Sequence, residues 1–429
     1  MNTSIADLNR LERFGWRLGL QTMHKLLDHL GHPERQLRYI HITGSNGKGF
    51  TAFFLASYLT QLGYRTGLYT SPHLCDLRER FRMNGHWIDS SVLNQLAKEV
   101  VTICHWMYRH QGIQPTHFEA LTAIGFLWFA QQKADWVVLE VGLGGRLDAT
   151  NVIPASNICL FSSISLEHQD VLGKTIEKIA WEKSGILKYN NLAAALQVHP
   201  RALQILKQRA KQVHCLLWSC PNDFKFQIQG SKLAWEGPHF KVKLDNPHRN
   251  SLEAWNASLV LAGISLLAAK GVVWDESQFQ TLWEKKLWPG RFEYLSPGFN
   301  ILIDGAHNPE AAWTLNRILA QKYPQKKWII LNGFLRDKNY DRFIRHIYSR
   351  IALSVVTQVP SSRSHDGEAI VEAWEKMKIR TLYIPDWKQA LTLVKAKASE
   401  STPVLITGSI YLIGACRQAL VGLQGLSRI

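Results

Sequence analysis

A glycine-bearing loop with a lysine lies between a β-branched run and an apolar stretch. The loop reads Thr-Gly-Ser-Asn-Gly-Lys-Gly-Phe-Thr over residues 43–51. Glycines after a strand let backbone N–H groups curl around phosphate oxygens, and the N-terminus of the next helix adds a favourable dipole. Lys48 would then reach the β- and γ-phosphates of a nucleotide. The loop is shorter than the generic phosphate-binding pattern and has Gly49 directly after the lysine, so a plain glycine turn remains the alternative.

A glutamate closes an apolar run farther along the chain. Residues 135–141 read Asp-Trp-Val-Val-Leu-Glu-Val, which is typical of a buried parallel strand. Open α/β sheets bind ligands at the carboxyl edge, so Glu140 could hold Mg²⁺ there. Alternatively, a neighbouring helix N-terminus holds this carboxylate. His168 follows a strand expected at 157–164 beside the Glu140 strand, although a lone histidine is more often a core or surface group.

Strand and helix signals alternate through the first part of the chain, as in a parallel α/β domain. The run at 39–43 before the glycine loop and the apolar stretch at 51–62 after it open a strand–helix–strand unit. Between 213 and 245 apolar and polar residues alternate, which predicts a small antiparallel insertion. The other expected strands are at 66–70, 135–141 and 157–164, and the expected helices are at 7–30, 91–110, 117–132 and from 176.

A proline- and glycine-bearing segment at 287–298 predicts a domain boundary. Strand–helix alternation restarts after it, with strands expected at 300–303, 327–331, 353–359, 381–384 and 404–407. We therefore predict a mixed α/β fold with two domains. Residues 1–290 would form an ATP-binding domain with a P-loop-type, mostly parallel sheet and the antiparallel insertion. Residues 291–429 would form a smaller, Rossmann-like C-terminal domain.

The composition favours a globular chain in a reducing compartment. Of its 429 residues, 46% are hydrophobic and 20% are charged. The first thirty residues lack a secretory apolar core, and the longest apolar run, 258–269, is about half of a bilayer span. The six cysteines form no CxxC pair, so we expect a cytoplasmic protein with no disulfide and no membrane partner.

The net charge of +16 admits a nucleic acid, an anionic membrane surface or small polyanionic substrates as partners. The basic residues are scattered along the chain, and no basic stripe interleaved with aromatic residues stands out. We therefore expect a solvated surface and an anion-binding cleft, without a nucleic-acid partner. No coiled-coil heptad is present, and a monomer is expected.

An ordered set of motifs over about 370 residues resembles one enzyme family. HITGSNGKGF at 41–50 is similar to the shortened ATP loop of the folylpolyglutamate synthase and dihydrofolate synthase family, within the Mur ligase superfamily. The further matching stretches are TSPH at 70–73, LEVGLGGRLDATN at 139–151, SISLEHQDVLG at 163–173, AWEKSGILK at 180–188, WPGRFE at 288–293, DGAHNP at 304–309 and ITGSIYLIG at 406–414.

The resemblance implies ATP as a substrate and Mg²⁺ as the metal, with a monovalent cation as an optional addition. The implied metal ligands are Ser71, Glu140, His168 and Lys183, of which the family carries the lysine as a carbamate. The residues implied to bind ATP are Gly44, Ser45, Asn46, Gly47, Lys48, Gly49, Asn256, Arg291 and Asp304. The resemblance also implies catalytic roles for Lys48, His307, Arg291 and Lys183.

The substrates that the resemblance implies are dihydropteroate or a reduced folate, and L-glutamate. It also implies that residues 291–429 are the glutamate-ligase domain. Phe118 and Glu119 are the candidates for the pterin-bearing substrate, and Lys338, Arg363 and Ser409 are those for the carboxylates of glutamate. Two residues depart from the family pattern: Phe50 replaces a usual serine, which leaves Thr51 as the nearest hydroxyl, and Arg78 replaces a usual asparagine.

The expected function is a bifunctional dihydrofolate synthase/folylpolyglutamate synthase. It would add L-glutamate to dihydropteroate and to reduced folates through an acyl phosphate, at the expense of ATP. One alternative is an enzyme with only one of these two activities. Another is a catalytically impaired ATP- or nucleic-acid-binding protein on the same fold, which Phe50 and the basic charge motivate. A peptidoglycan-type ligase would need a nucleotide-sugar peptide site that the sequence does not identify.

Overall fold

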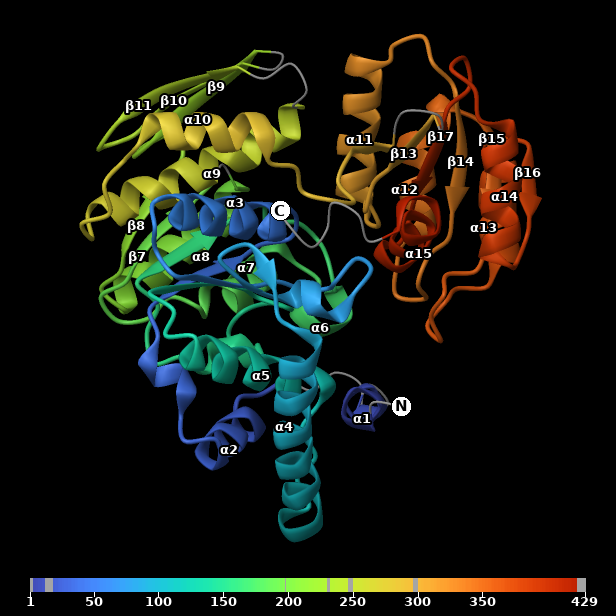
Figure 1. Ribbon diagram of the computed structural model, residues 1–429. Helices are drawn as coiled ribbons and strands as arrows, with labels where there is room; N and C mark the ends of the chain where they lie inside the picture. The colour runs from blue at the N-terminus through green and yellow to red at the C-terminus, as the bar shows by residue number, and fades with distance from the viewer. Residues whose placement is uncertain are drawn as a thin grey trace. The chain divides into compact units, whose positions relative to one another are not determined.

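The computed structural model describes residues 3–11, 18–196, 198–229, 232–245, 250–295 and 300–422 (Figure 1). These residues divide into two compact units: unit 1 holds 3–73 and 78–286, and unit 2 holds 74–77 and 287–422. The mixed α/β fold class is confirmed. No pattern in the sequence predicts that residues 74–77 belong to unit 2. The functions assigned to residues 1–290 and 291–429 stay predictions. Gly230, where the sequence also predicts a turn within the insertion, and Pro297-Gly298 of the predicted boundary lie outside the described residues.

The sheet of unit 1 has the order β4-β3-β2-β5-β1-β6-β7-β8 among the described residues. Its strands β1, β2, β5, β6, β7 and β8 run parallel, and β3 and β4 form an antiparallel edge. β1 and β5 are buried along their whole length, which explains their nearly continuous apolar sequences. The bounds are β1 Tyr39–Thr43, β2 Thr66–Tyr69, β3 Phe81–Met83, β4 His86–Trp87, β5 Trp136–Glu140, β6 Ile158–Phe161, β7 Leu192–Ala195 and β8 Leu216–Ser219.

Two expectations about this sheet are wrong. The strand that leads to His168, β6, does not pair with the Glu140 strand, because the loop-bearing strand β1 lies between them. The three strands nevertheless end at the same level, since Ile42 is opposite Glu140 and Thr43 is opposite Phe161. The antiparallel insertion also starts later than residue 213, because β8 is a parallel strand of the main sheet.

Helices cover both faces of the unit 1 sheet. On one face α3 packs against α9, and Gly263 of α9 lies against Leu160 of β6. On the other face α7 and α8 share a buried cluster with Cys159 and Phe161. The bounds are α1 Thr3–Arg10, α2 Gln21–His29, α3 Lys48–Gln61, α4 Ser90–Gln111, α5 His117–Gln131, α6 Gln169–Leu172, α7 Ile176–Ser184, α8 Pro200–Gln212, α9 Ser251–Ala268 and α10 Glu276–Lys285, with 3₁₀ turns at Pro33–Gln36, Leu77–Arg80 and Ala149–Val152.

Helix α9 is a core element of unit 1. By length and composition alone it is apolar enough to cross a membrane, yet 72% of that stretch is buried inside the protein. Asn250 and Glu253 form a reciprocal capping box at its start. The apolar stretch is thus longer than the run at 258–269 that the sequence showed, and the protein itself covers most of it.

The insertion is a three-stranded antiparallel sheet of β9 (Lys225–Gln229), β10 (Lys232–Glu236) and β11 (Lys241–Asp245). Its register places Trp235 between Phe226 and Val242. Apolar side chains alternate with exposed polar ones along β11, and β9 and β10 contact α9. The predicted period of two is therefore confirmed for these strands.

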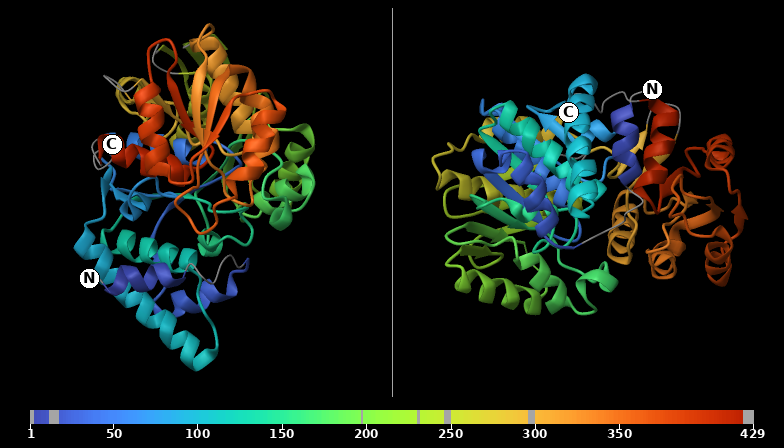
Figure 2. Two further views of the ribbon diagram at one scale, coloured as in Figure 1. Left: turned by 90° about the vertical axis from the view of Figure 1, so that its right-hand side faces the viewer. Right: turned by 90° about the horizontal axis from the view of Figure 1, so that it is seen from below.

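Unit 2 is a second α/β sheet with the order β12-β13-β17-β14-β15-β16, parallel except for β12. Helices α11, α12 and α13 pack on one face, and α14 and α15 pack on the other (Figure 2). The five expected strands are confirmed, and β12 had been missed. The bounds are β12 Glu293–Leu295, β13 Ile301–Ile303, β14 Trp328–Asn332, β15 Ile351–Val356, β16 Thr381–Tyr383, β17 Val404–Thr407, α11 Pro309–Lys322, α12 Tyr340–Ile347, α13 Gly367–Lys376, α14 Trp387–Lys397 and α15 Ile410–Val421, with a 3₁₀ turn at Tyr348–Arg350.

Candidate active site

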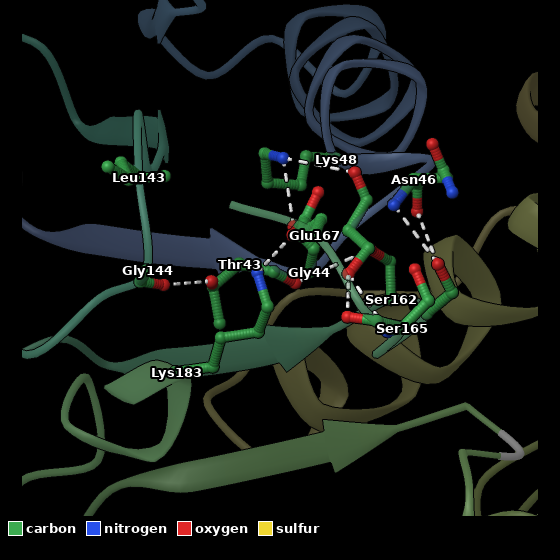
Figure 3. Close-up of polar contacts among 12 residues, drawn as sticks. Thr43, Gly44, Asn46, Lys48, Leu143, Gly144, Ser162, Ser165, Glu167 and Lys183 are labelled. Carbon is green, nitrogen blue, oxygen red and sulfur yellow. Dashed lines mark hydrogen bonds and ion pairs between the residues drawn. The ribbon is translucent and has the colours of Figure 1, made fainter. Parts of the chain in front are cut away.

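The glycine loop joins β1 to α3 and packs against the segment that follows β6 (Figure 3). The backbone N–H of Ser45 donates to the carbonyl oxygen of Ser163 at 2.6 Å, and the N–H of Asn46 donates to the Ser163 hydroxyl at 3.0 Å. The N–H of Ser165 in turn donates to the hydroxyl of Ser45 at 3.0 Å. These bonds fix the loop at the carboxyl edge of the sheet, where a phosphate group can approach it.

Two glycines of the loop are required by close contacts. Gly47 precedes α3 with φ of 91°, and a Cβ atom there would lie 2.3 Å from Oδ1 of Asn256. A Cβ atom on Gly44 would lie 1.8 Å from Oγ of Ser162. The structure therefore places Asn256, from the distant helix α9, directly against the loop.

Lys48 is the first residue of α3 and folds back over the loop. Its Nζ donates to the carbonyl oxygens of Gly44 at 2.9 Å and Ser45 at 3.3 Å (Figure 3). These bonds hold the ammonium group over the loop backbone. A phosphate in the loop would replace carbonyl partners with charged ones, which form stronger hydrogen bonds.

Glu140 and Ser71 lie together at adjacent strand ends. Glu140 is the last residue of β5 and is buried, and its Oε2 accepts a hydrogen bond from the backbone N–H of Ser71 at 3.0 Å. His168 follows β6 and caps α6 with a left-handed backbone, φ 45°. The structure thus brings Ser71 and Glu140 into contact, and the joint role of His168 with them stays a prediction.

The Glu140 carboxylate and the Ser71 hydroxyl offer the oxygen ligands that Mg²⁺ prefers, and His168 would add a ring nitrogen. Mg²⁺ is commonly held by one or two carboxylates together with substrate phosphates. Within the described residues no group of three or more His, Cys, Asp and Glu side chains gathers that could hold a metal by itself. The candidate set contains two residues of these types, Glu140 and His168, and Ser71 adds a hydroxyl. Phosphate oxygens of a bound nucleotide would supply further ligands.

Lys183 and Glu167 form a buried ion pair beside the loop lysine (Figure 3). Their Nζ and Oε1 atoms are 2.8 Å apart, and the two side chains are 2% and 12% exposed. Burial lowers the pKa of Lys183, and the charge of Glu167 opposes that shift. Burial alone would raise the pKa of Glu167, but Lys183 and Lys48 together bring it down to about 2. That Lys183 is carried as a carbamate stays a prediction.

Phe118 and Glu119 begin helix α5 but lie in different surroundings. The Phe118 ring packs over Gly142, where a Cβ atom would be 2.5 Å from its Cζ. Glu119 is buried, and its Oε2 accepts hydrogen bonds from the backbone N–H and the hydroxyl of Thr116 at 2.7 and 2.9 Å. A capping box therefore accounts for Glu119. Its role as a substrate contact stays a prediction.

The two departures from the family pattern have structural roles. Phe50 is buried and stacks on Phe54, with ring centroids 4.3 Å apart. The Thr51 hydroxyl is buried and has no hydrogen-bond partner, so Thr51 does not stand in as an exposed hydroxyl of the loop. The guanidinium carbon of Arg78 lies 5.2 Å from the ring centroid of Trp87 on β4.

In unit 2, Arg291, which precedes β12, lies against the segment after β13 that holds Asp304 and His307. Asp304 accepts hydrogen bonds from the backbone N–H groups of Phe292 at 2.8 Å and Ala306 at 2.9 Å. A Cβ atom on Gly305 would lie 2.1 Å from Nη1 of Arg291, and Nδ1 of His307 is 2.8 Å from the Gly305 carbonyl oxygen. Burial raises the pKa of Asp304, and Arg291 opposes this shift.

The candidates for glutamate binding lie after β14, β15 and β17, the neighbouring inner strands of the unit 2 sheet. Ser409 precedes α15, is 3% exposed, and has a hydroxyl oxygen without a hydrogen-bond partner. Arg363 donates to the hydroxyl of Tyr411 at 3.1 Å. Lys338 pairs with Asp337 at 2.9 Å, and its loop bonds to the Arg363 loop through the N–H of Arg336.

Two further charged residues in the site regions were missed as functional candidates. Glu167 stood inside a quoted motif, next to His168, but nothing in the sequence paired it with Lys183. Glu293 stood inside the WPGRFE motif; it accepts from the Gly290 N–H at 2.8 Å and forms a two-pronged ion pair with Arg417, at 2.9 Å for the shorter contact. Arg417 lies 124 residues away, so no sequence signal joined the pair.

Comparison with known proteins covers almost the whole chain. Residues 290–410 match the family described as Mur ligase, glutamate ligase domain. The dihydrofolate synthase/folylpolyglutamate synthase of Bacillus subtilis is 30% identical over 427 residues, which cover 95% of this chain and 96% of the relative. The folylpolyglutamate synthase of Lacticaseibacillus casei is 30% identical over 406 residues, which cover 92% and 93%.

Solved structures show the same extent of similarity. The folylpolyglutamate synthase of Mycobacterium tuberculosis complexed with ADP matches with a TM-score of 0.88 and 29% identity, over 97% of this chain and 98% of that chain. E. coli FolC in complex with DHPP and ADP matches with a TM-score of 0.86 and 26% identity, over 97% of each chain. The chain therefore belongs to the folylpolyglutamate synthase and dihydrofolate synthase family of Mur-type ligases.

Proposed function

We propose that this chain is an ATP-dependent ligase that joins L-glutamate to dihydropteroate and to reduced folates. A carboxylate oxygen of the acceptor attacks the γ-phosphorus of ATP, and the bond to ADP breaks, which leaves an acyl phosphate. The amine of glutamate then attacks the acyl carbon, loses a proton and expels inorganic phosphate as the amide forms. The observation that carries the proposal is the glycine loop with Lys48 at the strand edge that also carries Glu140 and Ser71.

The loop residues would hold the nucleotide by positioning and charge. Lys48 would exchange the carbonyl oxygens of Gly44 and Ser45 for phosphate oxygens, and Asn256 lies against Gly47 on the same loop. Glu140, Ser71 and His168 would hold Mg²⁺, which offsets charge on the phosphates when bound. Arg291 would add positive charge, with Asp304 as the candidate for the ribose hydroxyls and His307 for the transferred group. Most of the catalytic gain in phosphoryl transfer comes from such positioning.

Lys183 is proposed to act near the metal, and its carbamate form belongs to this proposal. Burial lowers its pKa, which favours the neutral amine that reacts with carbon dioxide, while the ion pair with Glu167 favours the ammonium form. A carbamate would place an anion beside the Glu167 carboxylate and would therefore need a cation between them.

We propose that unit 1 supplies the acceptor-binding residue and that unit 2 supplies the glutamate-binding residues. Phe118, which packs on Gly142 two residues after Glu140, would stack on the pterin-bearing substrate. Ser409, Arg363 and Lys338 would bind the carboxylates of glutamate, since a buried unpaired hydroxyl and two cations lie near one sheet edge. We further propose a monomer in a reducing compartment, in keeping with six free cysteines.

Phosphate release with ATP, Mg²⁺ and L-glutamate tests the activity, with dihydropteroate and tetrahydrofolate supplied in parallel. Turnover of both acceptors supports the bifunctional proposal, and turnover of one assigns a single activity. A Lys48→Met variant serves as the control, because it removes the loop cation but keeps an unbranched side chain. If the folded wild-type protein releases no phosphate with either acceptor, the ligase proposal is refuted, and the impaired ATP-binding alternative that Phe50 suggests is favoured.

A further inference from the structure

The strand that leads into the glycine loop is tied by two side chains to the segment that follows Glu140. His41 and Thr43 project to the same face of β1, because side chains alternate along a strand. The Thr43 hydroxyl donates to the Gly144 carbonyl oxygen at 2.6 Å. Nε2 of His41 lies 2.9 Å from the hydroxyl oxygen of Thr150, in the 3₁₀ turn Ala149–Val152.

The contact of His41 continues as a chain of hydrogen bonds. The Thr150 hydroxyl donates to Oδ1 of Asp148 at 2.5 Å, and that carboxylate also accepts from the backbone N–H groups of Thr150 at 3.0 Å and Leu143 at 2.8 Å. All members are buried, and His41 and Thr150 have no exposed surface. The chain thus runs from the central strand to the backbone of Leu143, three residues after Glu140.

The proton count fixes the direction of these bonds. A hydroxyl has one proton, and Thr150 gives it to Asp148, so its oxygen must accept from Nε2–H of His41. Nδ1 of His41 is then a bare acceptor, and the structure leaves it without a partner. Burial lowers the pKa of His41 to about 3, and the charge of Lys188 acts in the same direction, so the ring stays neutral in this arrangement.

We infer that His41 is a positioning residue for the proposed ligase reaction. Through Thr150 and Asp148 it holds the backbone at Leu143 in place. This backbone follows the candidate metal ligand Glu140 and includes Gly142, on which Phe118 packs. Loss of the Nε2–H donor removes one bond from the buried Thr150 hydroxyl and loosens the link to Asp148. The backbone at Leu143 is then held less firmly, although Thr43 still binds Gly144, and the neighbouring Gly142 offers the Phe118 ring a less fixed packing surface.

Four variants separate this role from simple core packing. His41→Leu and Thr150→Val remove the donor and the hydroxyl while they keep apolar bulk in the core. His41→Gln and Thr150→Ser are the matched controls, because the Gln amide can replace Nε2–H and Ser retains the hydroxyl. Amide hydrogen exchange in peptides that cover residues 141–150 reads the positioning of the segment without any need for turnover.

We expect His41→Leu and Thr150→Val to speed exchange in this segment by about tenfold or more, the effect of losing one buried hydrogen bond. The kcat should fall by a similar factor while the KM for glutamate stays unchanged, since the candidate glutamate residues belong to unit 2. His41→Gln and Thr150→Ser should remain close to wild type in both measurements.

Unchanged exchange in His41→Leu and Thr150→Val would overturn the inference, as would equal losses in the conservative variants. The inference rests on the proposed function only for its kinetic part. An inactive wild-type protein would refute that function, while the exchange data would still decide whether His41 holds the segment.

Discussion

Gly47, the glycine before α3, leaves little room for a larger residue. Gly47→Ala would place a Cβ atom 2.3 Å from Oδ1 of Asn256, at a φ of 91° that L-residues avoid. Gly63 offers a matched control, because it has nearly the same φ, 89°, and no atom within 4 Å of its notional Cβ. We expect both variants to lose about 1 kcal/mol from backbone strain. Only Gly47→Ala should abolish ADP binding in calorimetry, and equal affinities for the two variants would contradict the close packing.

The buried pair of Glu167 and Lys183 makes a second prediction at the residue scale. Glu167→Gln leaves the Lys183 ammonium without a counter-ion, which should cost about 3–5 kcal/mol of unfolding free energy. The double variant Glu167→Gln/Lys183→Met should recover much of this loss, because no uncompensated charge remains. Urea unfolding measures both. A stabilising effect of Glu167→Gln alone would instead indicate that residue 183 carries an anionic carbamate.

Glu119, in the first turn of α5, has two possible roles, as part of a helix cap and as a substrate contact, and substitutions can distinguish them. Glu119→Gln preserves the capping box with Thr116, whereas Glu119→Ala removes it. We expect Glu119→Ala to lose about 1 kcal/mol of stability and Glu119→Gln to lose much less. If Glu119 serves only as a cap, neither change raises the KM for the pterin-bearing acceptor. A raised KM in Glu119→Gln at unchanged stability would support its predicted role as a substrate contact.

Most of the elements that position the site could be predicted from the sequence because each has a local signal. The β-branched run 39–43 and the apolar run that ends in Glu140 correspond to β1 and β5. β7 was missed because Leu192–Ala195 is short and rich in alanine, which disfavours strands. Within the range of the expected helix 7–30, the structure has the end of α1 and the whole of α2, and residues 12–17 between them are not among the described residues.

Contacts between distant segments could not be predicted by any local pattern. Asn256 against Gly47 and Arg417 against Glu293 depend on tertiary packing. The side-by-side placement of β5 and β6 was wrong for a related reason, since strand order is decided by the whole sheet. Motif resemblance supplied the names of several site residues, whereas the geometry that joins them came only from the fold.

At the scale of the whole molecule, buried neutral histidines set an acid limit to stability. His41 has a pKa lowered from 6.5 to about 3, so between these values the unfolded chain binds a proton that the folded chain excludes. The unfolding free energy therefore falls as pH drops below 6.5, by up to roughly 1.4 kcal/mol per pH unit. His117, with a pKa lowered to about 4, acts in the same direction.

The contribution of His41 can be isolated by comparing His41→Gln with the wild-type protein. Unfolding free energies are measured in urea at several pH values between about 4.5 and 6.5. Their slope against pH should be shallower in the variant, because unfolding of the variant no longer includes the uptake of one proton by His41. Above this window the two slopes should agree. Equal slopes within the window would show that the His41 ring is not excluded from protonation in the folded state.

The central claim is that an acceptor carboxylate is activated as an acyl phosphate, and oxygen transfer tests it most directly. The acceptor carboxyl group, of dihydropteroate or of the γ position of tetrahydrofolate, is labelled with ¹⁸O and turned over with ATP, Mg²⁺ and L-glutamate. Mass spectrometry of the released phosphate should find one labelled oxygen for each amide bond formed, because the attacking carboxylate oxygen leaves with phosphorus. Amide product with unlabelled phosphate would contradict the account.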